Sequence, residues 1–439
     1  MRIGIGQSRR VTRSFAFGLF APVYRSISIF KTPVRLMPYV TGFRLFNRTD
    51  KLERLMFKNT PAAKFEVSET QAAVRRKFLT SLLAGGGALV LAACGGGSDT
   101  SNLDSVADRS RRGGSNSNSG GASSPTGASA PTGASTPADT NGVILDTSFG
   151  VKGDGTTNDR AALQRAIDGS VGQILLITGQ SRIDSAGLDL RTNSHVRFAS
   201  GASIKLLPHN TDTYEILRLS DVNSVTLESP YLDGSKELNS AKSGEWGMGI
   251  SLNGATNCTI TSPTTINCWG DGIYINNSDT KSGSYSKNIT VNSHHASGCR
   301  RQGVSIISGS GIVFNSPLWE NICGTQPGAG LDIEPNDNTA ILQNIQIVSP
   351  TTANCAGGGI LIYFGAFPGP VSKTVSISIT NHTDTTSPGG SFNVQGLKLN
   401  GYVVNGSITS ANPVWKRAMS LEDWDKGGPT VTVTNAHIG

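Results

Sequence analysis

One short pattern recurs six times in the second half of the chain: a glycine, an apolar residue, a variable residue and another apolar residue. The glycines are Gly249, Gly272, Gly303, Gly330, Gly359 and Gly396, which lie 23 to 37 residues apart. Short β-branched runs that return at this spacing form one supersecondary unit per repeat, and neighbouring units stack on one another. The pattern therefore predicts an all-β solenoid rather than a sandwich.

Four cysteines form a second recurring column, because each lies just before one of the repeated strands: Cys268, Cys299, Cys323 and Cys355. Equivalent positions of stacked strands are about 4.8 Å apart, whereas the Cβ atoms of a disulfide lie about 3.8 Å apart. Disulfides and a metal site are the alternatives. We predict free, buried thiols that point inward.

Positive charge is concentrated at the amino-terminal end. Residues 1–94 carry 16 Lys/Arg against 4 Asp/Glu, whereas residues 95–439 carry 22 Lys/Arg against 27 Asp/Glu. The repeated part is therefore acidic, and it lacks the positive charge with which proteins bind nucleic acid. We expect no nucleic-acid partner.

A charged start, an apolar middle and a small-residue end follow one another between Arg75 and Cys94. The apolar run is too short to span about 30 Å of hydrocarbon, but it suits the core of a signal peptide. Its end, Leu91-Ala92-Ala93-Cys94, resembles the bacterial lipobox, and Arg75-Arg76 resembles a twin-arginine export signal. We predict a signal peptide over 56–94 and lipidation of Cys94; a buried helix is the alternative.

The segments on either side of this signal differ in composition. Residues 1–55 show no clear period and remain unassigned; Met56 is a candidate initiator, so that they need not be translated. Residues 95–142 consist mainly of Gly, Ser, Thr, Ala, Pro and Asn, which cannot bury enough apolar surface to fold. We expect a flexible tether that holds the 143–439 domain at the bacterial cell envelope, on its periplasmic side or at the cell surface.

A distinctive motif opens this domain. Phe149-Gly150-Val151-Lys152-Gly153-Asp154-Gly155 precedes a helical stretch in which Ala162, Leu163, Ala166 and Ile167 fall on one face, with Thr157, Asn158 or Asp159 as N-cap. The motif resembles the start of the pectate lyase superfamily, which includes pectate lyases, polygalacturonases, rhamnogalacturonases and alginate epimerases. The resemblance implies a right-handed parallel β-helix with an N-terminal capping helix over 143–439. It does not fix the activity.

Strand alternation identifies the side chains that face outward from the repeats. The middle positions are Ser251, Tyr274, Ser305, Asp332, Leu361 and Lys398, and the next are Asn253, Asn276, Ile307, Glu334, Tyr363 and Asn400. Asp332 and Glu334 share one face, about 6.5 Å apart. Such a pair can serve glycoside hydrolysis or, together with Asp337, bind Ca²⁺ through oxygen ligands; a solvated acidic turn is the alternative.

Further candidates lie in neighbouring repeats. Arginine binds sugar carboxylates, and the resemblance to pectate lyases implies arginine as a base, which points to Arg301 and Arg300. We take Asp332, Glu334, Arg301 and Tyr274 as the catalytic candidates. The substrate-binding candidates are Asp271, Arg300, Ser305, Tyr363, Lys398 and Trp246. Asp271 also suits a turn, Trp246 also suits packing, and His294-His295 is a secondary candidate in which one ring must point inward.

The families' own catalytic patterns are incomplete here. The Asp-Asp, Gly-His-Gly and Arg-Ile-Lys runs of polygalacturonases are absent, and Asp332-Ile333-Glu334-Pro335 lacks the histidine of the epimerase run Asp-Pro-His-Glu. We predict a monomeric, exported, lipid-anchored enzyme that acts on an acidic polysaccharide as a lyase or C5-epimerase, with Ca²⁺ as the one cofactor candidate. The alternatives are a glycoside hydrolase that uses Asp332 and Glu334, and a non-catalytic carbohydrate-binding or surface-structural β-helix.

Overall fold

The computed structural model describes residues 142–439. The predicted signal peptide, its lipidation site Cys94 and nearly all of the predicted tether lie outside the described residues. None of the helices in residues 142–439 combines the length and the apolar character needed to cross a bilayer.

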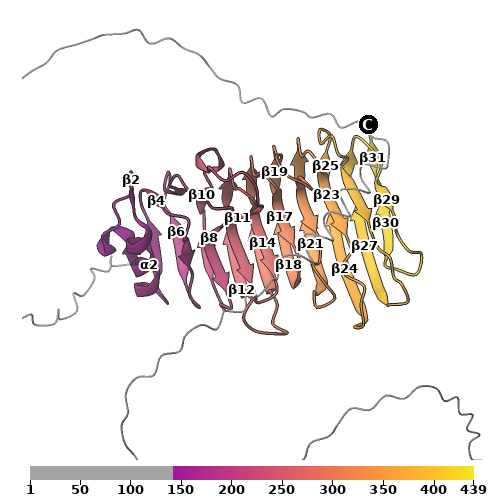
Figure 1. Cartoon of the computed structure of the whole chain (residues 1–439), viewed down its shortest axis with the longest axis horizontal. Coiled ribbons are helices and arrows are strands. Elements are labelled where there is room, and N and C mark those ends of the chain that lie inside the picture. Colours follow the sequence, from indigo (N-terminus) through magenta and orange to yellow (C-terminus); the bar gives the residue numbers. More distant parts are fainter. Residues whose placement is uncertain (1–141) are drawn as a thin grey trace, which may run out of the picture. The chain divides into compact units, whose positions relative to one another are not determined.

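The described chain winds through three parallel sheets, and successive turns stack side by side along one axis (Figure 1). The first sheet contains β1 (Val143–Leu145), β3 (Ile174–Ile177), β6 (His195–Phe198), β9 (Thr226–Glu228), β12 (Thr256–Thr261), β15 (Lys287–Asn292), β18 (Gly309–Asn315), β21 (Leu342–Val348), β24 (Lys373–Thr380), β27 (Val404–Ala411) and β30 (Thr430–Thr434). The second contains β2 (Asp154–Asn158), β4 (Gln180–Ile183), β7 (Ser203–Leu206), β10 (Tyr231–Asp233), β13 (Thr264–Ile266), β16 (His295–Ser297), β19 (Leu318–Glu320), β22 (Thr351–Ala353), β25 (Thr383–Asp384), β28 (Val414–Trp415) and β31 (His437–Ile438). The third contains β5 (Leu188–Asp189), β8 (Thr213–Ser220), β11 (Trp246–Asn253), β14 (Asp271–Asn276), β17 (Gln302–Ile306), β20 (Ala329–Ile333), β23 (Gly358–Tyr363), β26 (Phe392–Gln395) and β29 (Ser420–Glu422). The predicted β-solenoid is confirmed.

Helix α2 (Arg160–Gly169) lies at the first turn, and two short 3₁₀ helices, η1 (Asp146–Phe149) and η2 (Lys236–Leu238), complete the helical content of the described residues. α2 buries the predicted face of Ala162, Leu163, Ala166 and Ile167. Its N-cap is Asp159, but the carboxylate of Asp159 makes no cap bond and instead accepts from the amides of Lys152 and Gly153, at 2.8 and 2.9 Å. The opening motif is thereby fastened to the start of the helix.

The recurring glycine has a steric cause. A Cβ atom on Gly249, Gly272, Gly303 or Gly330 would lie 2.5 to 2.7 Å from the carbonyl oxygen of the equivalent glycine one turn later. It would also meet inward side chains of the second sheet, such as Thr265 or Trp319. Only glycine fits where the third sheet begins so close to the second, which explains why the sequence repeats it.

The sixth repeat departs from the predicted alignment. A Cβ on Gly359 would meet the carbonyl of Ser391, and Leu361 pairs with Asn393, so Ser391 and not Gly396 takes the glycine position. Lys398 and Asn400 therefore follow β26 instead of lying in the predicted outward columns. The other five repeats keep the predicted register, from Ser251↔Tyr274 through Ser305↔Asp332 to Asp332↔Leu361.

Corner residues with left-handed backbone explain the cysteine column. Asn267, Asn321 and Asn354 have φ of 51°, 55° and 51°, a conformation that asparagine tolerates. The residue after each corner points into the core. Cys268, Cys299 and Cys355 occupy such positions as buried free thiols, as predicted.

Cys323 does not belong to this inward column, which corrects the prediction. Its corner is Asn321, so the inward position falls on Ile322, which is fully buried. Cys323 lies one residue later, is half-buried and is not one of the free thiols of residues 142–439. The free thiols of those residues are Cys258, Cys268, Cys299 and Cys355.

Candidate functional site

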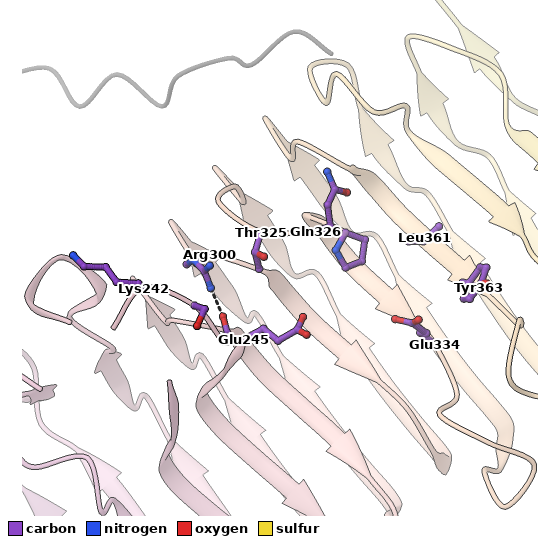
Figure 2. A pocket seen from close by; sticks show the side chains of 11 residues that line it. Lys242, Glu245, Arg300, Thr325, Gln326, Glu334, Leu361 and Tyr363 are labelled. Atoms are coloured by element: carbon purple, nitrogen blue, oxygen red, sulfur yellow. Dashed lines mark hydrogen bonds between the residues drawn. The ribbon is translucent and has the colours of Figure 1, made fainter. Parts of the chain in front are cut away.

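A cavity of about 290 Å³ opens on the outer face of the third sheet (Figure 2). Its floor comes from Glu334, directly after β20, and from Leu361 and Tyr363 on β23; its walls come from the segments that precede β11, β17 and β20. The lining residues are Lys242, Ser243, Gly244, Glu245, Arg300, Thr325, Gln326, Pro327, Glu334, Leu361 and Tyr363. Three residues predicted from the sequence, Arg300, Glu334 and Tyr363, therefore come together in one cavity.

Asp332 is the buried neighbour of Glu334. Its side chain is fully buried and does not line the cavity, and its Oδ2 accepts from Gln302 Nε2 at 2.9 Å. Burial raises the pKa of Asp332 well above its ordinary value, and the charge of Glu334 raises it further. The two carboxyl groups are hydrogen-bonding neighbours, so Asp332 holds the proton and Glu334 is the member that reaches the cavity.

Arg301 lies under the cavity wall in a buried ion-pair network. Its Nε is 3.3 Å from Asp271 Oδ1, its Nη2 donates to Ser305 Oγ at 3.3 Å, and Ser305 Oγ donates to Asp271 Oδ2 at 2.8 Å. On the cavity side its Nη1 is 4.0 Å from Glu245 Oε2. The predicted residues Arg301, Asp271 and Ser305 are thus brought together, but all three are fully buried and none lines the cavity, so Asp271 and Ser305 do not contact a substrate as predicted.

The electrostatics of Arg301 suit a structural cation. Burial alone would lower the pKa of Arg301, but the carboxylates of Asp271 and Glu245 outweigh it and raise the pKa above its ordinary value. A guanidinium held in this way keeps its proton and does not line the cavity. At this position Arg301 is suited to orient the Glu245 carboxylate and not to accept a proton from a sugar.

Arg300 differs from its neighbour because it lines the cavity. Its Nη1 donates to the Gly244 carbonyl, and its Cζ lies 4.3 Å from the centroid of the Trp269 ring. These contacts hold the guanidinium plane in place. Lys242, an exposed residue of the same wall, adds a second positive charge. The cavity can therefore receive a carboxylate beside Arg300.

An apolar platform adjoins the cavity on the same sheet face. Met248, Tyr274 and Ile307 form a cluster separate from the main core, with Trp246 packed against it. The rings of Trp246 and Tyr274 meet edge to face, 6.1 Å between centroids. Burial raises the pKa of Tyr274, so its phenol stays protonated. Trp246, the more exposed of the two rings, suits stacking under a sugar ring, and Tyr274, which is 6% exposed, supports it from the buried side.

Several predicted residues lie away from this face. Lys398 pairs with Asp423 at 3.0 Å and is exposed. Asp337 is exposed and accepts from the amide and hydroxyl of Thr339, both at 2.6 Å. His294 points inward, as expected for one of the pair, and His295 pairs with Glu320 on the second sheet at 3.0 Å.

The predicted calcium ligands do not converge. Asp332 is bonded to Gln302, Glu334 faces the cavity, and Asp337 turns towards Thr339. Within residues 142–439 no three His, Cys, Asp or Glu side chains are placed to hold a metal ion. These residues do not fit the ion, and we derive no step through it.

The sequence did not single out several residues of the cavity as site residues. Lys242, Glu245, Thr325, Gln326 and Pro327 come from the segments that enter the third sheet, which the repeat pattern does not cover. Their place in the sequence could have indicated them, because each segment immediately precedes a strand that contains a repeated glycine. Figure 2 shows the Glu245 side chain extending from one wall towards Glu334.

Comparisons with known proteins concern the fold. No protein-family model matches the chain, and no curated protein matches it by sequence. Among solved structures, the A-module of a mannuronan C-5 epimerase of Azotobacter vinelandii is 14% identical, with 67% of this chain and 95% of that chain covered and a TM-score of 0.45. A tailspike of the Acinetobacter baumannii bacteriophage Fri1, a capsular polysaccharide depolymerase, is 16% identical over 68% of this chain and 57% of that chain, with a TM-score of 0.44. A surface protein and adhesin of Streptococcus pneumoniae is 12% identical over 66% of this chain and 100% of that chain, with a TM-score of 0.38. These are proteins to which the chain is similar at low identity; its own sheet topology shows that residues 142–439 form a parallel β-solenoid.

Proposed function

We propose that the chain is an enzyme that acts on a uronate-containing polysaccharide by removing the proton from C5 of the sugar. The observation that carries this proposal is the cavity that Glu334 shares with Arg300, Lys242 and Glu245, with Tyr363 on the floor. A uronate carboxylate paired with Arg300 makes its C5 proton more acidic, because the charge that develops on its removal is stabilised.

Glu334 and Tyr363 carry out the two proton transfers of this reaction. Glu334 takes the C5 proton, and the electron pair left behind forms the C4–C5 double bond as the bond from C4 to the leaving oxygen breaks. Tyr363 gives its phenolic proton to that oxygen; burial raises the pKa of Tyr363 and keeps the phenol protonated beforehand. Return of a proton to the opposite face of C5, with no bond to oxygen broken, would give epimerisation from the same arrangement.

A glycoside hydrolase is the second candidate, and one observation favours it. Glu245 and Glu334 line the same cavity from opposite sides, as a pair of carboxyl groups that flank a scissile bond would (Figure 2). Asp332 suits this role less, because it is buried beneath Glu334 and bonded to it. The hydrolase would use Glu245 and Glu334 instead of the predicted Asp332 and Glu334.

The first experiment incubates the purified full-length chain with polygalacturonate, alginate and glucuronate-containing glycans. A lyase forms an unsaturated product that absorbs in the near ultraviolet, and a hydrolase forms reducing ends without that absorbance. Glu334→Gln should lower turnover by about 10²-fold or more, while the control Glu320→Gln, which changes a carboxylate on the second sheet, should leave it unchanged. Glycan binding without turnover by the unaltered chain would favour the non-catalytic alternative.

We also propose that the enzyme is exported and held at the bacterial envelope by a lipid on Cys94. The order of Arg75-Arg76, the apolar run and Leu91-Ala92-Ala93-Cys94 supports this proposal. The acidic balance of residues 95–439 argues against nucleic acid as the partner.

A further inference from the structure

A second cavity of about 420 Å³ lies on the same face of the third sheet, over β8, β11 and β14. Trp246 and Tyr274 line it, so the apolar platform forms one of its edges. None of the residues that line the first cavity lines this one.

Asn253 lines this second cavity and carries a buried acceptor that has no partner within the described residues. Its side chain is 5% exposed, and its Nδ2 donates to Asp279 Oδ2 at 2.8 Å. That bond fixes the amide, and Oδ1 has no hydrogen-bond partner within the described residues. Buried acceptors of native proteins are almost always paired, so this oxygen is suited to a hydroxyl or amide N–H of a ligand.

The charges of the second cavity disfavour a carboxylate. Glu215 lines it and Asp279 stands at its exposed rim. The one cation of the lining, Arg218, already pairs with Asp189 at 2.6 Å and lies 3.8 Å from Glu215. Burial raises the pKa of Glu215, and a uronate beside it would add a second negative charge where water is scarce.

The pairing of strands in the third sheet gives the distance between the two cavities along the solenoid axis. Asn253 pairs with Asn276 on β14, and the same column continues through Ile307 to Glu334, three turns of the solenoid away. Three turns at about 4.8 Å span roughly 14 Å, or about three sugar units of roughly 5 Å. In a glycan that alternates two sugars, units three apart are of opposite kinds.

We propose that the second cavity is a binding site for a sugar without a carboxylate, and that the glycan alternates uronate with an uncharged hydroxyl- or amide-bearing sugar. This inference rests on the proposed function, because it places the uronate beside Glu334. The glycan would cross the apolar platform between the two cavities, with Asn253 accepting from the uncharged unit.

The test measures binding by titration calorimetry on the full-length chain in the Glu334→Gln background, so that turnover does not consume the probe. The two probes are a hexasaccharide of alternating glucuronate and N-acetylglucosamine and a hexasaccharide of galacturonate. The alternating probe should bind at least about 10-fold more tightly, which corresponds to about 1.4 kcal/mol.

Asn253→Ala should lower affinity for the alternating probe about 10-fold and change that for hexagalacturonate less than about twofold. The matched control is Asn315→Ala, which removes an asparagine that also donates at 2.8 Å, but on the first sheet. If Asn253→Ala fails to fold, Asp279→Asn at the exposed rim replaces it and should strengthen hexagalacturonate binding severalfold.

Equal or tighter binding of hexagalacturonate, equal losses for both probes in Asn253→Ala, or binding of neither probe would overturn the inference. The proposed function fails separately. If Glu334→Gln leaves turnover unchanged while the probes still bind selectively, the catalytic assignment is wrong and the second site stands.

Discussion

Arg301 is the residue on which the cavity wall depends. It is fully buried and compensates the charge of Asp271, which is also fully buried. Arg301→Met should reduce the free energy of unfolding by about 3–5 kcal/mol, because it leaves the buried carboxylate of Asp271 without a compensating positive charge. Urea denaturation measures the change.

A surface ion pair provides the control for this prediction. Arg197→Met breaks a bond to Glu228 at 2.7 Å between two partly exposed side chains of the first sheet and should cost less than about 1 kcal/mol. The double variant Asp271→Asn with Arg301→Met should regain part of the loss, because both charges are gone. Equal stabilities of Arg301→Met and the unaltered chain would show that Asp271 is compensated by other groups.

Individual residues of the candidate site were predictable to the extent that strand alternation governs them. Asp332 and Glu334 share the outer face, as the two-residue spacing requires. The same rule could not foresee that one carboxyl would be buried beneath the other, nor that Arg300 would line the cavity while Arg301 turned under it. Those outcomes depend on the wall segments, whose path has no period.

At the level of strands and turns, the second sheet carries a buried histidine network that occurs twice. His294 bonds to Thr265 Oγ1 at 2.8 Å and accepts from Trp319 Nε1 at 3.1 Å. Three turns later His382 bonds in the same way to Thr352 and Trp415, at 2.8 and 3.0 Å. Burial lowers the pKa of His294 to about 3 and that of His382 to about 4.

These histidines make stability depend on pH. Unfolded, each binds a proton near pH 6.5; folded, each stays neutral down to about pH 3 or 4. The unfolded state therefore binds more protons between these values, and stability falls as pH drops below 6.5, by about 1.4 kcal/mol per pH unit and histidine. His294→Gln should flatten the plot of unfolding free energy against pH by that amount, whereas the exposed control His437→Gln should not. An unchanged slope in His294→Gln would show that the network tolerates the charged ring.

The repeated elements were predictable because the same steric demand acts in every turn. Five of the six glycine strands keep their predicted register, since a Cβ would strike the next turn's carbonyl. The exceptions arise where a different residue type occupies the equivalent position of a turn. Ser391 replaces the glycine in the sixth repeat, and Ile322 replaces the cysteine after the Asn321 corner.

On the scale of the whole molecule, the candidate glycan path exists only because turns stack. Glu245, Arg300 and Glu334 are far apart in the sequence and lie in different turns, yet they line one cavity. A polymer that runs along the solenoid axis can meet both cavities and the platform between them. A solenoid predicts such a surface in general, whereas its shape and charge come from the non-repeating segments.

A lipid on Cys94 would hold the solenoid domain at the end of a flexible tether. A flexible tether of the 48 residues from 95 to 142 has a root-mean-square span of roughly 40 Å, so a lipid on Cys94 would leave the cavity free to meet polymer near a membrane. Cys94→Ala removes the thiol that carries the lipid, and should move the protein out of the membrane fraction while its turnover on a dissolved glycan stays the same. Cys258→Ala, which alters a buried thiol of the solenoid, should leave the protein with the membrane. If Cys94→Ala remains in the membrane fraction, another segment holds the chain there and the lipobox assignment is wrong.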